Sequence, residues 1–163
     1  MGDNSDHLLR DVLTVVSLFF FIILDAGSVT WYEPRPVETT SDVNTELTAE
    51  SRLLFKGSTY AQMSWNFSLT PDLNLITIVL TLNSVDVATV VPSAGIAGIQ
   101  SDFKGRFNVT WISQRVTLII FNVTEDDDGE FGCTINTFQG AQNKIWKRKM
   151  KVQVLGMFCF ILF

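Results

Sequence analysis

One short segment, Asp127-Asp128-Gly129-Glu130-Phe131-Gly132-Cys133, constrains the fold of this chain more than any other part of its sequence. It follows an alternating apolar pattern that includes Leu118 and Ile120. Alternation with a period of two is typical of a β-strand with one buried face. Gly129 tolerates a positive φ and permits a tight turn. The segment therefore predicts two strands joined by a compact corner.

The same alternation recurs through the middle of the chain. Between residues 60 and 70, apolar side chains alternate with polar ones, and the apolar set is Ala61, Met63, Trp65, Phe67 and Leu69. Segments rich in β-branched and aromatic residues predict further strands: Leu75–Leu82, Val87–Val91, Phe107–Ile112, Arg115–Phe121, Phe131–Thr137 and Ile145–Val154. Several short strands separated by turn signals favour a sandwich or a barrel.

Residues 45–155 resemble an immunoglobulin domain of the variable type, on the strength of Leu118-x-Ile120-x-x-Val123 and the Asp-x-Gly-x-Phe-x-Cys run. The resemblance implies an all-β fold, an immunoglobulin-like antiparallel β-sandwich of about 100 residues. It also implies that Asp127 is a corner aspartate paired with Arg106. The alternative is that both side chains lie in solvent, where such pairs contribute little.

The chain departs from this family at its first cysteine. The alignment places Trp65 where strand B normally carries a cysteine, opposite Cys133; a rival alignment would make Trp65 the tryptophan of strand C. We expect Trp65 and Cys133 to form a core pair without a disulfide, since Cys159 lies beyond the last strand. A disulfide closing such a loop stabilises by about 4 kcal/mol. A buried tryptophan removes about 200 Å² from water, a contribution of similar order.

Both ends of the chain are apolar. Residues 12–24 form a block shorter than the roughly 20 residues that span a bilayer, and Ala26-Gly27-Ser28 follow it. We therefore predict a signal peptide helix over residues 1–28, although acidic residues outnumber Arg10 before the block. A buried helix is the alternative. Residues 29–44 are expected to form a loose lead-in, with a short first strand as an open alternative, because the prolines at 34 and 36 disfavour a helix.

Residues 156–163 form a wholly apolar tail. Three interpretations remain open: the start of a membrane-spanning helix, a tail docked on the domain, or an unusual lipid-anchor signal. We favour the first, so membrane attachment through this tail is one expectation.

Three sequons, at Asn66, Asn108 and Asn122, are candidate glycosylation sites if the chain is secreted. Alternation along its strand places Asn66 outward. Glycans on that sheet would leave the opposite sheet freer for contact.

Charged clusters carry no clear chemistry. The acidic run Glu125–Asp128 lacks the spacing of a calcium loop and is interpreted as a solvated corner. Basic residues on the last strand are interpreted as outward charges that protect a sheet edge, in preference to a patch for anionic glycans or lipids: Lys144, Lys147, Arg148, Lys149 and Lys151. The net charge of −5 argues against nucleic acid as a partner.

No nucleophile–base pair, metal-ligand spacing or phosphate-binding loop is found in the sequence. We therefore expect no enzyme activity, no cofactor and no metal. The resemblance implies a secreted or cell-surface module for recognition or adhesion that binds another extracellular protein, and homophilic contact is open.

The candidate binding loop runs from Phe138 to Asn143, with Phe138 turned outward by alternation from Cys133; its candidate contact residues are Phe138, Gln139, Gln142 and Asn143. The alternatives are a carbohydrate-binding β-sandwich and a purely structural module of a larger receptor.

Overall fold

The computed structural model describes residues 27–43 and 45–156. The expectations for the signal peptide up to residue 26 and for the apolar tail after Gly156 lie outside these residues. Within the two described ranges, no helix has the length and apolar character needed to cross a membrane.

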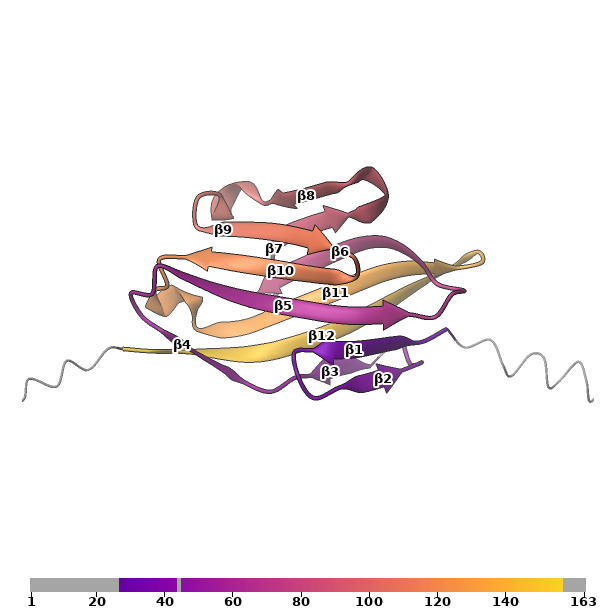
Figure 1. Ribbon diagram of the computed structural model, residues 1–163, viewed down its shortest axis with the longest axis horizontal. Helices are drawn as coiled ribbons and strands as arrows, with labels where there is room; N and C mark the ends of the chain where they lie inside the picture. The colour runs from indigo at the N-terminus through magenta and orange to yellow at the C-terminus, as the bar shows by residue number, and fades with distance from the viewer. Residues whose placement is uncertain (1–26, 44, 157–163) are drawn as a thin grey trace, which may run out of the picture.

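Two β-sheets pack face to face, which confirms the predicted all-β sandwich (Figure 1). The first sheet has the order β2-β1-β5-β10-β9. Its strands are β1 (Val29–Glu33), β2 (Glu38–Thr40), β5 (Tyr60–Leu69), β9 (Phe107–Ile112) and β10 (Arg115–Phe121).

The second sheet has the order β3-β12-β11-β6-β7-β8, and β4 also pairs with β12. Its strands are β3 (Glu46–Thr48), β4 (Arg52–Phe55), β6 (Asn74–Leu82), β7 (Val85–Val91), β8 (Ile96–Ile99), β11 (Gly129–Gln139) and β12 (Gln142–Leu155). Short 3₁₀ helices lie in three connections: η1 (Pro92–Ala94), η2 (Ser101–Phe103) and η3 (Glu125–Asp127).

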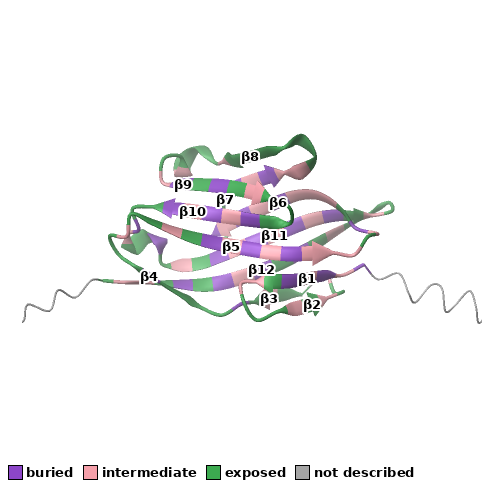
Figure 2. Cartoon of the chain, viewed as in Figure 1, coloured by how far each residue is buried: buried purple, intermediate pink, exposed green. Residues whose placement is uncertain are grey.

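Buried residues alternate with more exposed ones along the strands, as the bands of colour in Figure 2 show. The buried residues of both sheets form one apolar cluster. On β5 the buried residues are Met63, Trp65 and Phe67, and on β11 they include Phe131, Cys133 and Ile135. These are the positions that the period-two pattern assigned to the inner face. The local pattern is decisive here because adjacent residues on a strand point to opposite faces.

The sandwich begins earlier than the sequence suggested. β1 pairs antiparallel with β5, and both Val29 and Trp31 are fully buried, so the lead-in does contain a short first strand, which belongs to the first sheet. The prolines, which disfavour a helix, follow β1 and therefore do not interrupt its pairing. The core thus gains a tryptophan that the predicted domain boundary at residue 45 excluded.

The last strand is not an edge strand, which corrects the interpretation of its basic residues. β3 and β4 both run parallel to β12 and cover the side opposite β11. Lys147 and Lys151 are exposed, while the Lys149 Nζ lies 2.8 Å from a Glu46 carboxylate oxygen and 3.1 Å from one of Glu130. Edge protection therefore does not explain these lysines.

Arg148 is fully buried, because it shares the inward side of β12 with Trp146 and Met150. Its Nη1 donates to Glu38 Oε2 at 2.5 Å. Its Nη2 donates to the backbone carbonyl oxygens of Pro34, at 2.9 Å, and Pro36, at 2.5 Å. A buried charge is tolerated when it is paired and hydrogen-bonded. Arg148 therefore ties the second sheet to the connection between β1 and β2.

Replacing Trp65 with alanine is expected to destabilise the protein by about 3–5 kcal/mol, because it opens a cavity in the core. The matched control is Ile112→Ala, since Ile112 is 74% exposed, and its change should stay within about 0.5 kcal/mol. Chemical denaturation measures both. Equal unfolding midpoints for the two variants would contradict the burial of Trp65.

Candidate functional site

The candidate binding loop is a tight hairpin. β11 and β12 remain paired up to Gln139 and Gln142, so only Gly140 and Ala141 connect them. Gly140 has a φ of 58°, which favours glycine. Phe138 and Asn143, expected within the loop, form a cross-strand pair instead. The hairpin is therefore a firmly paired extension of the second sheet.

Phe138 faces outward, as alternation predicted, and is 45% exposed. Its ladder neighbours are Asn143 on β12 and Asn74 on β6. Ile145 lies two residues after Asn143 on the same face, diagonal to Phe138, and is 37% exposed. Sequence reasoning missed Ile145, although alternation along the strand predicted over Ile145–Val154 offered a signal, because Ile145 and the buried Trp146 must point to opposite faces.

A side-chain contact holds the hairpin against the rest of the domain. The Gln139 Nε2 donates to the Asp72 carboxylate, which lies in the connection between β5 and β6. A hydrogen bond from the Thr70 side chain is the main cause that lowers the pKa of Asp72, and Gln139 and Lys144 lower it further against the opposing effect of burial. Gln139 therefore positions the hairpin, while Gln142 and Asn143 remain exposed.

A groove of about 480 Å³ lies beside this face. Ile145 and Lys147 of β12 form part of one side, and Val43 and Glu46 contribute from the chain around β3. The face thus combines apolar side chains with a carboxylate and an ammonium group, a composition suited to contact with another protein.

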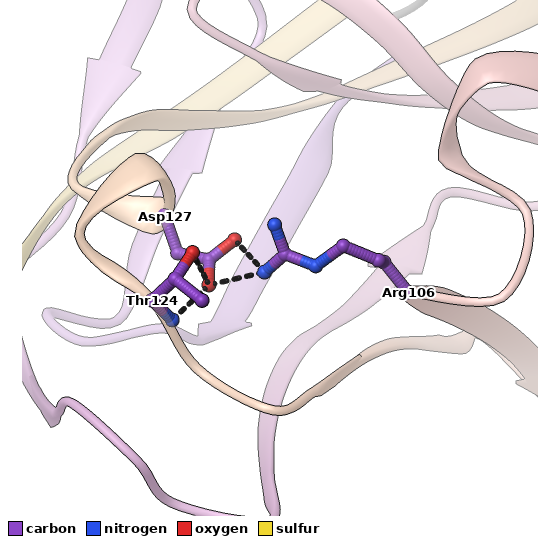
Figure 3. A network of polar contacts seen from close by, with 3 residues as sticks. All are labelled: Arg106, Thr124 and Asp127. Carbon is purple, nitrogen blue, oxygen red and sulfur yellow. Dashed lines mark hydrogen bonds and ion pairs between the residues drawn. The ribbon is translucent and has the colours of Figure 1, made fainter.

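Arg106 and Asp127 meet at one end of the sandwich, as the resemblance implied (Figure 3). One guanidinium nitrogen of Arg106 donates to both carboxylate oxygens, at 2.9 and 2.7 Å. The backbone N–H of Thr124 donates to the same carboxylate at 2.8 Å. The Asp127 side chain is 1% exposed and that of Arg106 is 39% exposed. The pair therefore joins the start of β9 to the β10–β11 connection and is not open to a ligand.

Two other acidic residues of this corner, Glu125 and Asp128, also make contacts within the domain. Glu125 lies 2.8 Å from the Lys56 ammonium. Asp128 accepts a hydrogen bond from the Val154 backbone at 3.0 Å. Among residues 27–43 and 45–156, no group of three or more histidine, cysteine, aspartate or glutamate side chains is placed to hold a metal ion.

Trp65 and Cys133 lie in one apolar cluster but come from different sheets, β5 and β11. Cys133 is a free thiol, and burial raises its pKa well above the ordinary value of 9.0. A nucleophilic cysteine needs its thiolate form. The structure therefore gives Cys133 a packing role.

All three sequons lie on the first sheet or at its end. Asn66 and Asn108 point outward from β5 and β9, because the residues on either side of each are buried. Asn122 is exposed directly after β10. None of these positions is on the second sheet.

No protein-family model matches the chain. No curated protein matches it either. Among solved structures, the chain is similar to murine CRIg with 14% identity and a TM-score of 0.51, over 68% of this chain and 92% of that one. It is also similar to the titin M4 domain with 16% identity and a TM-score of 0.48, over 67% and 91% of the two chains. The similarity to murine CRIg, together with the sheet topology, shows that the fold is immunoglobulin-like.

Alkylation of Cys133 should be slow in the native protein at pH 8 and fast after unfolding in guanidinium. Burial raises the pKa of the Cys133 thiol in the folded protein above 9.0. The contribution of the neutral thiol to the free energy of unfolding is therefore fully present below pH 9 and is lost as pH rises further. Peptide mass spectrometry measures the alkylation of Cys133 separately from that of Cys159. Rapid native labelling at Cys133 would show that the thiol is accessible.

Proposed function

We propose that this chain is an extracellular recognition module of the variable immunoglobulin type. It binds another protein through the outer face of the second sheet, near the β11–β12 hairpin. The chain is secreted or displayed at the cell surface in this proposal.

The strand order supports the variable type. Domains of this type add two strands to the sheet that carries the last two strands. Here β7 and β8 extend the sheet of β6, β11 and β12 in that way. The fold alone does not choose a function, so the binding face has to be argued from its own residues.

The distribution of surface groups carries the proposal. The sequons occupy the first sheet, while Phe138 and Ile145 are exposed on the outer face of the second. Glycans at Asn66, Asn108 and Asn122 would cover one side of the sandwich and leave the other open. Exposed aromatic residues that pack into a partner dominate the energy of many interfaces.

The hairpin is also prepared for binding. Its strands stay paired to their ends, and Gln139 is held by Asp72. Association therefore loses little further conformational entropy there. The same contact disfavours a carbohydrate site that uses Gln139, because the Gln139 carboxamide is already engaged by Asp72.

Expression in a secretory eukaryotic cell line should yield N-linked glycan at Asn108, which is exposed on β9. Asn108→Gln should remove one glycan, as seen by gel mobility and peptide mass spectrometry. Asn74→Gln is the matched control, because Asn74 is exposed but lies outside a sequon. A chain that stays in the cytosol without glycan would contradict the extracellular placement.

A multivalent form of the protein, screened against arrayed extracellular proteins and against a glycan array, should select a protein ligand. Phe138→Ala should then weaken that binding about 30-fold, which corresponds to about 2 kcal/mol for a residue at an interface centre. Ile112→Ala removes an exposed apolar residue from the first sheet and should leave affinity unchanged. Equal affinities for the wild type and Phe138→Ala would place the site elsewhere.

A further inference from the structure

One side of the sandwich has an incomplete edge. β1 pairs with β5 only from Val29–Leu69 to Glu33–Asn66. After Pro34 the chain turns back as β2, and it then runs along β12 of the second sheet as β3 and β4. In the described part of the chain, β5 from Tyr60 to Trp65 therefore has β10 on one side and no strand on the other. These six residues extend about 20 Å.

The backbone groups at this open edge can be assigned. In an antiparallel strand, the N–H and C=O of one residue point to the same neighbour, and successive residues alternate. The Phe67 N–H donates to Gln114 and the Thr59 carbonyl accepts from Asn122, both on the β10 side. Odd-numbered residues of β5 thus face β10, so Gln62 and Ser64 direct their backbone groups to the open edge.

A groove of about 400 Å³ lies at that position. Gln62 and Ser64 line one wall, and Ser51 and Arg52 contribute to the other. The buried side chain of Met150 also forms part of the lining. The groove therefore offers unpaired backbone donors and acceptors, polar walls and an apolar contact.

Positive side chains exceed negative ones in the lining of the groove. Glu33 is already bound to Arg115, at 2.5 Å. Arg35 and Arg52 are exposed at the groove, and neither forms an ion pair within residues 27–43 and 45–156. Glu50 is the remaining carboxylate in the lining. The groove therefore has two guanidinium groups and one carboxylate without an ion-pair partner among the described residues. This excess of positive charge favours an anionic ligand.

We propose that this groove binds an extended, acidic peptide segment of a partner protein, which adds as a strand to the free edge of β5. Strand addition uses main-chain hydrogen bonds for affinity and alternate side chains for specificity. One set of side chains faces Arg35 and Arg52 and is acidic. The other set faces Met150 and is small and apolar. This edge belongs to the first sheet and is separate from Phe138, so the two sites can fail independently.

A fluorescein-labelled peptide, Glu-Val-Glu-Val-Glu, tests the charge preference by fluorescence anisotropy against the full chain. It should bind at least tenfold more tightly than Lys-Val-Lys-Val-Lys. The double variant Arg35→Glu/Arg52→Glu should reverse this order. Lys104→Glu/Lys151→Glu is the matched control, because it changes the net charge equally at exposed residues outside the groove. Equal effects of the two double variants would overturn the proposal.

Backbone methylation of the peptide tests strand addition. Only alternate N–H groups of an added strand point to β5. N-methylation of the three glutamates and N-methylation of the two valines should therefore differ, with one series abolishing binding and the other retaining it. Hydrogen exchange at Gln62 and Ser64 should slow in the complex. Equal binding by both methylated series, or unchanged exchange at both residues, would overturn the proposed pairing.

Discussion

Apolar packing between the two sheets holds this domain together, because Cys133 on β11 has no cysteine opposite it on β5. Trp31, Trp65 and Trp146 are all fully buried between the layers. Each such side chain removes about 150–250 Å² from water, and at about 25 cal/mol per Å² this stabilises by roughly 4–6 kcal/mol before entropy is counted. A disulfide in a loop of this length would contribute about 4 kcal/mol. The tryptophans therefore offset the loss of a covalent bridge.

Two arginines stabilise the domain at places where the chain changes direction. Arg106 joins the start of β9 to the corner before β11 through the buried Asp127. Arg148 binds the carbonyl oxygens of the turn after β1 and the carboxylate of Glu38. By fixing that turn, Arg148 also fixes the position after β1 at which the chain stops pairing with β5. The incomplete edge of the first sheet is a consequence of this route.

The two outer faces of the sandwich differ in chemistry. The first sheet carries the sequons, small polar side chains such as the hydrogen-bonded pair Ser64 and Thr117, and exposed apolar residues that include Tyr60 and Ile112. The second carries exposed Phe138 and Ile145, together with the lysines of β12. Burial drives one face of each strand inward, but it leaves the outward residues free to specialise. Exposed apolar residues occur on both faces, so the position of the sequons on or next to the first sheet is what favours the second sheet as the proposed recognition face.

The sequence by itself determined β5, β6, β7, β9, β10, β11 and β12, and for β5 and β11 it also determined the buried side, because alternation is a local property that requires no knowledge of the neighbouring strand. Trp65, Cys133 and Phe138 were placed in this way, and the resemblance paired Arg106 with Asp127. Only the tertiary structure decided which strands lie side by side. The place of β1 in the first sheet, the covering of β12 by β3 and β4, the burial of Arg148 and the contact of Gln139 with Asp72 all join residues far apart in the chain. Such pairings depend on the geometry of the whole sandwich, and no short sequence pattern records them.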